Sequence, residues 1–227
     1  SRMNFNRLIQ DLTNNGYAIL AVNNRGSSGY GKSFYKMDDK NHGENDLKDC
    51  IWGKKWLQEQ GYIDTERMGI IGGSYGGYMT MAAMTFTPKE FKVGVNIFGV
   101  TNWIRTLKSI PPFWEASRKA LYNELGDPYS KDSIRLKKIS PLFHAEKVKN
   151  PVMVLQGSND PRVLQIESDE IVAELKKNNT VVEYVIFEDE GHGFRKKENQ
   201  INGYRQIKDF LDDYLKTPPL LDPKKEL

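Results

Sequence analysis

Short apolar segments alternate with amphipathic segments along most of this 227-residue chain, and no other feature of the sequence restricts its fold as much. Short apolar runs are typical of buried strands, whereas apolar residues repeated every three or four positions are typical of helices. Strands that alternate with helices favour a largely parallel sheet with helices on both faces. We therefore expect a one-domain α/β fold with strands at 17–22, 67–71, 93–98, 152–156 and 181–187, and helices near 5–12, 44–60, 75–86, 163–178 and 199–215.

The segment GGSYG at 72–76 lies where the second expected strand passes into a helix. A serine on a tight strand-to-helix turn holds its hydroxyl clear of the backbone, and glycines on both sides leave room for the approach of a substrate. The G-x-S-x-G pattern alone is weak, so the argument depends on its position between a strand and a helix. This setting predicts that Ser74 is a nucleophile.

A nucleophilic serine needs a general base, and the base needs a carboxylate that orients it. Of the three histidines, His192 follows the strand expected at 181–187 and lies between two glycines. Asp160 follows the strand expected at 152–156. Open parallel sheets place their sites at such strand ends. The order Ser74, Asp160, His192 is that of α/β-hydrolases and differs from the order in chymotrypsin-like and subtilisin-like enzymes.

Other interpretations of these residue types stay open at this point. Asp160 precedes a proline and also fits an ordinary turn. Asp189, three residues before the loop histidine, is a rival carboxylate, although it fits better as part of a solvated acidic run. His42 and His144 have no strand-end position and are interpreted as structural or exposed. No pair of histidines has metal-ligand spacing, so we expect no metal.

Residues 26–33, GSSGYGKS, match the P-loop pattern and follow the strand expected at 17–22. A P-loop also needs a regular helix that begins at its lysine, so that backbone N–H groups surround the phosphate. The polar residues at 37–43 carry no sustained apolar stripe, although 185–189 resembles an acidic strand end that could hold magnesium. Nucleotide binding at 26–33 is therefore a remote alternative.

The charge balance and the single cysteine exclude several classes of protein. A net charge of +3 is too small and too dispersed to indicate a nucleic-acid partner. Cys50 cannot form an internal disulfide and fits a reducing, cytoplasmic compartment, although the sequence leaves a periplasmic or secreted location open. Its place on an apolar stripe predicts burial and not reactivity. No apolar run approaches the length needed to span a membrane. We expect no cofactor and no membrane partner.

Four segments follow one another along the chain: NNRGSSGYG at 23–31, GGSYGGY at 72–78, GSNDPRV at 157–163 and DEGHGF at 189–194. With these segments in this order, the chain between Phe5 and Lys216 resembles the catalytic domain of the prolyl oligopeptidase family of serine peptidases. The acylaminoacyl-peptidase and dipeptidyl-peptidase branches are the most similar. The resemblance implies an α/β-hydrolase fold and a triad that cleaves short peptides. It also implies that residues 26–33 belong to the family's loop beside the active site and not to a P-loop.

The resemblance also implies roles for residues around the triad. The backbone N–H of Tyr75, the residue after the nucleophile, would be the first oxyanion donor. Val100, Trp103 and Val163 resemble the pocket for the residue before the scissile bond. Arg162 either holds the loop of the aspartate or meets a substrate carbonyl, and the sequence leaves both roles open.

Two parts of the family's chains have no match in this sequence. One is a strand that ends in a His-Gly-Gly-Pro-like loop and gives the second oxyanion donor; it would lie between the strands expected at 17–22 and 67–71. The other is the N-terminal β-propeller that gates access. We therefore interpret 1–216 as an N-terminally incomplete α/β-hydrolase domain, the C-terminal portion of a longer polypeptide, and 217–227 as a loosely held tail. A missing donor and an incomplete sheet predict that these residues alone are not a competent enzyme.

Three classes of function stay open. A peptidase that acts on short peptides is the first choice. A carboxylesterase would use the same triad with an easier leaving group, and a catalytically silent binding module with a hydrolase fold is favoured only by the missing oxyanion loop. The expected partners are a short peptide substrate and the N-terminal remainder of the polypeptide, and a homo-oligomer is left open.

Overall fold

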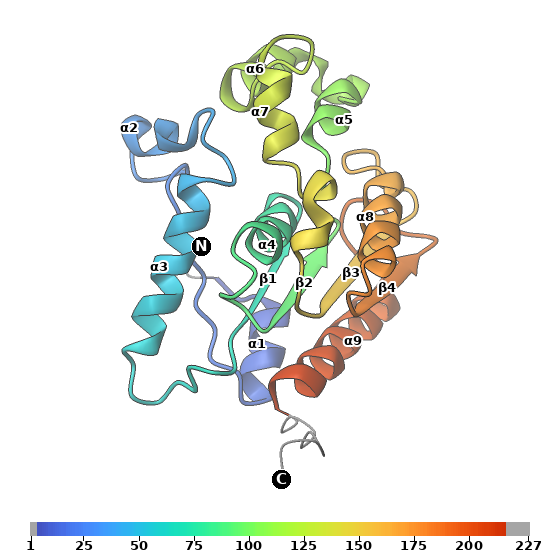
Figure 1. Cartoon of the computed structure of the whole chain (residues 1–227). Helices are drawn as coiled ribbons and strands as arrows, with labels where there is room; N and C mark the ends of the chain where they lie inside the picture. The colour runs from blue at the N-terminus through green and yellow to red at the C-terminus, as the bar shows by residue number, and fades with distance from the viewer. Residues whose placement is uncertain (1–3, 217–227) are drawn as a thin grey trace.

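A computed structural model describes residues 4–216 as an α/β domain built on a four-stranded sheet (Figure 1). All strand pairs are parallel, in the order β1-β2-β3-β4. The carboxyl ends of the strands therefore meet at one edge of the sheet. The strands are β1 (Gly69–Gly73), β2 (Val93–Ile97), β3 (Val152–Gly157) and β4 (Val182–Phe187).

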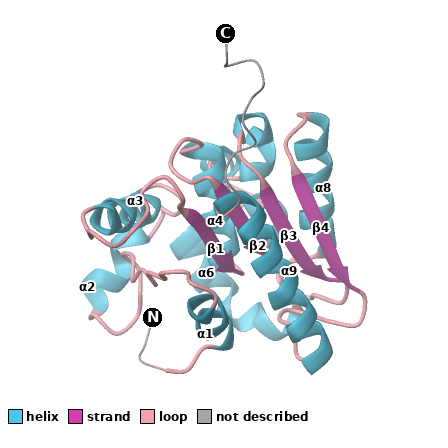
Figure 2. Cartoon of the chain, turned by 90° about the horizontal axis from the view of Figure 1, so that it is seen from below, coloured by secondary structure: helices cyan, strands magenta, loops and turns pink. Residues whose placement is uncertain are grey.

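Helices connect the strands and cover both faces of the sheet (Figure 1, Figure 2). Parallel neighbours need such crossovers, because a tight turn can join only antiparallel strands. The helices are α1 (Arg7–Asn14), α2 (Lys32–Tyr35), α3 (Asn45–Gln58), α4 (Tyr75–Phe86), α5 (Trp103–Lys108), α6 (Arg118–Leu125), α7 (Asp132–Lys138), α8 (Gln165–Lys177) and α9 (Lys197–Leu215), with 3₁₀ turns η1 (Lys36–Asp38), η2 (Pro112–Ser117) and η3 (Pro141–Lys147).

Side chains of β3 alternate between two hydrophobic cores, one on each face of the sheet. Val152 and Val154 pack in the core that α4 and α8 cover, whereas Met153 and Leu155 pack in the core that α1 and α9 cover. All four side chains are fully buried. An apolar run buried on both faces is what a central parallel strand requires, and burying each such side chain stabilises the fold by about 1.5–3 kcal/mol.

The structure confirms the expected helices and four of the five expected strands. The expected strand at 17–22 is wrong: this segment forms no strand, and its apolar residues Ile19 and Leu20 remain 38% and 37% exposed. A strand needs a hydrogen-bonded neighbour, and β1 pairs only with β2 within the described residues. The inner strand expected between 17–22 and β1 is not among residues 4–216, so the segment packs against Gly53 of α3 instead.

Residues 99–150 contain three short helices that the sequence pattern did not predict. α5, α6 and α7 are six, eight and seven residues long, which is too short for an apolar stripe to recur visibly.

Cys50 is half-buried against the core. Its burial and, to a smaller extent, nearby carboxylates raise the pKa of its thiol to about 12. No helix within 4–216 is long and apolar enough to cross a bilayer. The expected tail at 217–227 lies outside the described residues.

Candidate active site

Ser74 lies on the turn between β1 and α4 and has φ 55° and ψ −118°. A positive φ in a residue other than glycine costs about 1–3 kcal/mol, and such strain clusters at active sites. The N–H of Ser74 donates to the carbonyl of Ile97 at 2.9 Å, which ties the strained turn to the end of β2. Glycine is required at 72, because a Cβ there would lie 2.3 Å from the Gly76 carbonyl oxygen.

His192 lies on the loop after β4, between Gly191 and Gly193, and its side chain is 11% exposed. Its Nε2 atom is 2.8 Å from Oγ of Ser74, although 118 residues separate the two in the sequence. The ring of Phe98, which follows β2, packs against the imidazole with ring centroids 4.7 Å apart. This contact and the serine hydroxyl together fix the orientation of the imidazole.

Asp160 follows β3 and completes a hydrogen-bonded row of three side chains. Its Oδ2 atom is 2.7 Å from Nδ1 of His192, and its side chain is fully buried. Its Oδ1 atom accepts backbone N–H groups of Arg162 and Val163 at 2.8 and 3.0 Å. An ionised carboxylate only accepts hydrogen bonds, so Nδ1 of the histidine carries the proton and Nε2 faces Ser74 with a lone pair.

The loops that carry the aspartate and the histidine touch through their backbones. A Cβ at Gly157, the last residue of β3, would lie 2.4 Å from the carbonyl oxygen of Gly191. The N–H of Asn159 donates to the carbonyl of Glu190 at 2.9 Å. The β3–β4 register places Gly157 opposite Phe187, so the two loops leave the sheet side by side. Sheet register therefore brings the two side chains together.

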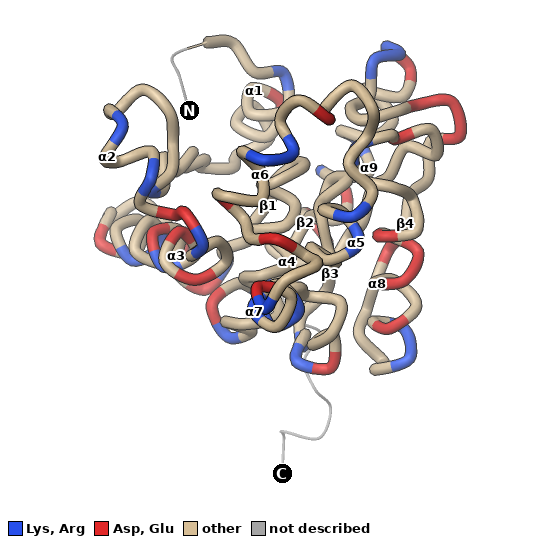
Figure 3. The backbone as a smooth tube through the Cα atoms, turned by 90° about the horizontal axis from the view of Figure 1, so that it is seen from above, with Lys and Arg blue, Asp and Glu red and all other residues tan. Residues whose placement is uncertain are grey.

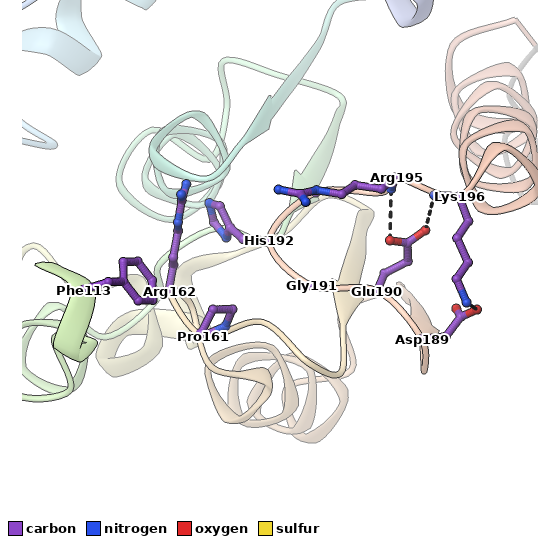
Figure 4. A pocket seen from close by; sticks show the side chains of 10 residues that line it. Phe113, Pro161, Arg162, Asp189, Glu190, Gly191, His192, Arg195 and Lys196 are labelled. Carbon is purple, nitrogen blue, oxygen red and sulfur yellow. Dashed lines mark hydrogen bonds and ion pairs between the residues drawn. The ribbon is translucent and has the colours of Figure 1, made fainter.

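The rival carboxylate Asp189 lies apart from the imidazole. It is an exposed side chain that pairs with Lys196 and accepts a hydrogen bond from Asn199 at 2.9 Å (Figure 4). The expected solvated acidic run is wrong for Glu190, which is 4% exposed and accepts the N–H groups of Arg195 and Lys196 at 3.0 and 2.8 Å. Burial alone would raise the pKa of Glu190, but these amide donors hold it below its usual value.

Tyr75, the first residue of α4, directs its amide and its side chain to different places. Its N–H has no acceptor within the helix, since the first amides of an α-helix lack one. Its hydroxyl donates to Oδ2 of Asp46, a fully buried carboxylate that also accepts the N–H of Leu47 at 2.8 Å. Burial and the charge of Asp46 raise the pKa of Tyr75 far above its usual value, so the hydroxyl remains a donor.

A buried polar cluster that the sequence reading missed lies behind Tyr75. His42 is 2% exposed, with Nε2 at 3.5 Å from Asp38 and 3.7 Å from Glu124, and its ring meets the Tyr75 ring edge-on at 5.7 Å. His42 is thus structural and buried, not exposed. Asp38, His42 and Asp46 are each four residues apart, and this spacing is the feature of the sequence that could have indicated the cluster. Within 4–216 no group of three or more side chains could hold a metal ion.

A pocket of about 430 Å³ opens beside His192. Its wall includes Phe113 of η2, Pro161 and Arg162 of the loop after β3, and Arg195 of the loop that carries His192 (Figure 4). The guanidinium of Arg162 lies over the Trp114 ring, 5.1 Å from the ring centroid. A serine, a histidine and a carboxylate joined in a row by hydrogen bonds, next to an open pocket, form the arrangement that acyl-transfer enzymes use.

Comparison with known proteins identifies the family of the chain. The model of the prolyl oligopeptidase family matches residues 3–218. The chain belongs to the prolyl oligopeptidase family. Dipeptidyl peptidase family member 6 of Caenorhabditis elegans is 41% identical over 206 residues, 90% of this chain and 28% of that protein. Dipeptidyl aminopeptidase BIII of Pseudoxanthomonas mexicana is 42% identical over 191 residues, 84% of this chain and 28% of that protein. The chain thus spans about 28% of the length of these curated relatives.

Solved structures of peptidases share the fold of this prolyl oligopeptidase family chain. A puromycin-hydrolyzing peptidase of Mycobacterium tuberculosis superposes with a TM-score of 0.78 and 31% identity, over 85% of this chain and 29% of that one. The acylaminoacyl peptidase of Pyrococcus horikoshii superposes with a TM-score of 0.78 and 29% identity, over 89% of this chain and 33% of that one. The fold is therefore that of the α/β-hydrolases in this family.

In this prolyl oligopeptidase family chain the P-loop match lacks the context that phosphate binding needs. Residues 4–25 form no strand, and α2, which begins at Lys32, has only four residues. A Cβ at Gly26 would lie 1.8 Å from a carboxylate oxygen of Asp38, so an acidic group directly backs the loop. Arg25 instead ties the loop to α3: its guanidinium donates two hydrogen bonds to Asp49, at 2.8 and 2.6 Å, and its backbone N–H donates a third at 2.8 Å. Nucleotide binding is not favoured.

The residues expected to bind substrate are placed in two different ways. Val100, Trp103 and Val163 are 5%, 4% and 3% exposed and belong to the core that α4 covers. Little of their surface is free to meet a ligand, and the role of this set stays a prediction. Arg162 is exposed at the pocket, and its backbone N–H, not its guanidinium, binds Asp160.

Proposed function

We propose that this chain carries the catalytic site of a serine peptidase that cleaves short peptides through an acyl-enzyme, with Ser74 as nucleophile, His192 as general base and Asp160 as the carboxylate that orients it. The single observation that supports this most is the row of hydrogen bonds from Ser74 Oγ to His192 Nε2 and from His192 Nδ1 to Asp160, at 2.8 and 2.7 Å. The peptidase names of the relatives agree with it.

In this mechanism His192 Nε2 takes the proton of Ser74 as Oγ attacks a peptide carbonyl carbon. The carbonyl oxygen becomes an oxyanion, and the free N–H of Tyr75 at the start of α4 would donate to it. The imidazolium then returns the proton to the leaving amine as the C–N bond breaks. A water molecule then attacks the acyl-enzyme through the same steps, with His192 taking the proton of the water and returning it to Oγ of Ser74. Asp160 stays ionised throughout and stabilises the imidazolium.

We also propose that residues 1–216 act as the catalytic domain of a longer polypeptide. The lengths of the relatives support this proposal, because the chain spans about 28% of them. The second oxyanion donor and a β-propeller that gates access would then lie outside the 227 residues. A chain assayed without them should lose one transition-state hydrogen bond, which is worth about 10²–10³ in rate.

A covalent probe and a substrate panel test the proposal on the longest native form of the chain. A fluorophosphonate should label Ser74, and Ser74→Ala should lower turnover by about 10⁶. Ser133→Ala changes a hydroxyl on α7 that bonds only its local turn, so it serves as the matched control. Hydrolysis of the amide bond of aminoacyl nitroanilides, in addition to nitrophenyl esters, would support a peptidase. Activity on nitrophenyl esters alone would favour the carboxylesterase alternative, and no labelling would favour a silent binding module.

A further inference from the structure

Arg195 is a basic residue at the active site that the proposed mechanism does not use. It lies three residues after His192 on the same loop and lines the pocket that contains the imidazole. Its side chain extends along the loop toward His192 (Figure 4). Within residues 4–216 its guanidinium makes no hydrogen bond or ion pair, so this cation faces the pocket without a protein partner.

The backbone around Arg195 is fixed. Its N–H donates to buried Glu190 at 3.0 Å, and the next N–H, of Lys196, donates to the same carboxylate at 2.8 Å. Gln200 of α9 donates to the carbonyls of Phe194 and Arg195 at 2.7 and 3.3 Å. A side chain on a fixed backbone loses less entropy when it binds a ligand, which makes Arg195 a prepared contact.

The acidic groups in the same pocket are already compensated. Asp189 pairs with Lys196, and Glu190 is buried with its oxygens on backbone amides. The guanidinium groups of Arg162 and Arg195 therefore leave this wall positive beside the imidazole of His192. An anion is the ligand that such a wall attracts.

A second hollow, of about 860 Å³, continues this positive surface between α1 and α9. Arg195 lines it as well as the pocket, so the two hollows meet at this residue. Elsewhere basic and acidic residues intermingle on α3, α7 and α8 (Figure 3). Among the residues that line this hollow, Asp11 is acidic and Lys208 is paired with Asp209 and Asp212, whereas the other charged residues are basic: Arg7, Arg195, Lys197 and Arg205.

We propose that Arg195 binds a carboxylate on the leaving fragment of the substrate, so that the site favours peptides with a negative charge shortly after the scissile bond. This rests on the proposed peptidase function. His192 must reach the leaving nitrogen to protonate it, so the leaving fragment lies against the loop that carries both residues. A free C-terminal carboxylate of a short peptide and an acidic side chain supply the same chemistry, and a bidentate Arg–carboxylate contact suits both.

The test uses the longest native form of the chain and one acyl part with different leaving fragments. The fragments are a dipeptide with a free C-terminus, its C-terminal amide, an amide that carries a glutamate, and a neutral nitroanilide. We expect kcat/KM to be about tenfold higher for each carboxylate fragment that binds Arg195 than for the uncharged amide, and the ratio to fall in 0.5 M salt. The two carboxylate fragments decide between a C-terminus and a side chain.

Variants separate this contact from general effects on the enzyme. Arg195→Gln should bring the carboxylate-to-amide ratio close to one, and Arg195→Lys, which keeps the charge, should retain part of it. Arg67→Gln, which changes an exposed arginine before β1 at the opposite end of the sheet, should leave the ratio unchanged. Ratios near one in the unmodified protein, or ratios that survive Arg195→Gln, would overturn the inference. Failure to cleave any substrate, the nitroanilide included, would instead count against the proposed function.

Discussion

Replacing Asp160 by asparagine changes one atom in the hydrogen-bonded row and should invert the tautomer of His192. The backbone N–H groups of Arg162 and Val163 point at one oxygen of Asp160 and need an acceptor. The asparagine oxygen must take that place, since the amide nitrogen only donates. Its NH₂ group then faces Nδ1 of His192, which becomes an acceptor, and the ring proton moves to Nε2. A protonated Nε2 cannot take the proton of Ser74.

The expected loss follows from this inversion and not from unfolding. The wrong tautomer should lower turnover by about 10⁴, equivalent to about 5.4 kcal/mol in the activation free energy. Both backbone donors stay paired, so the free energy of unfolding should change by less than about 1 kcal/mol. Asp160→Ala would leave the buried N–H of Val163 unpaired, at about 1–3 kcal/mol, together with the partly buried N–H of Arg162, and should lower stability as well.

Nitroanilide turnover and urea denaturation of the same protein samples measure both quantities. Asp189→Asn is the matched control, because it makes the same chemical change at the neighbouring carboxylate that pairs with Lys196. It should cost far less activity than Asp160→Asn. A folded Asp160→Asn protein within tenfold of normal turnover, or a larger loss for Asp189→Asn, would refute the assignment of the orienting carboxylate.

Two other changes test the backbone contacts and the electrostatics of the fold. Gly157→Ala should lower the free energy of unfolding, measured in urea, by about 1–3 kcal/mol, because its Cβ would lie 2.4 Å from a backbone oxygen of the histidine loop. Gly61→Ala is the control and should leave the free energy of unfolding unchanged, because nothing lies within 4 Å of its Cβ. Equal effects of the two substitutions would contradict the contact argument. Burial alone would raise the pKa of Asp212, but ion pairs with lysines and a tyrosine hydroxyl lower it to about 2. The stability that the ionised carboxylate contributes is present above the unfolded pKa of about 4 and is lost as the pH falls toward 2. The difference in the free energy of unfolding between the unmodified protein and Asp212→Asn should therefore shrink between pH 4 and pH 2, that is, from about the unfolded pKa to about the folded pKa. A difference that stays constant over this range would contradict the prediction.

The sequence predicts most of the sheet because its strands are short apolar runs with clear ends. The prediction at 17–22 fails for a reason outside the segment. Its composition suits a strand, but a strand also needs a neighbour, and residues 4–216 supply none at that position. Pairing is a property of two segments, whereas periodicity describes only one.

The side chains of the candidate site are predictable because each follows a strand. Ser74, Asp160 and His192 come after β1, β3 and β4, and strand ends can be located from the sequence. The cluster of His42 and Asp46 lies outside any strand end, in the turns around the start of α3, and only its burial distinguishes it from a solvated polar segment. Burial of polar residues in a loop depends on what packs over the loop, which a local pattern does not contain.

The distances within the site depend on backbone contacts that only sheet register fixes. The Ser74 N–H extends the β1–β2 pairing to the Ile97 carbonyl, and Gly157 touches the Gly191 carbonyl where β3 and β4 end. Between these two fixed points the imidazole of His192 has one short span to bridge, with the Phe98 ring against its face. The glycine at 157 therefore acts by letting two strand ends approach closely, and the residues next to it in the sequence do not reveal the backbone that it meets. The order of the three side chains along the chain can thus be predicted from local sequence patterns. The distances that allow them to form hydrogen bonds result from the pairing of whole strands.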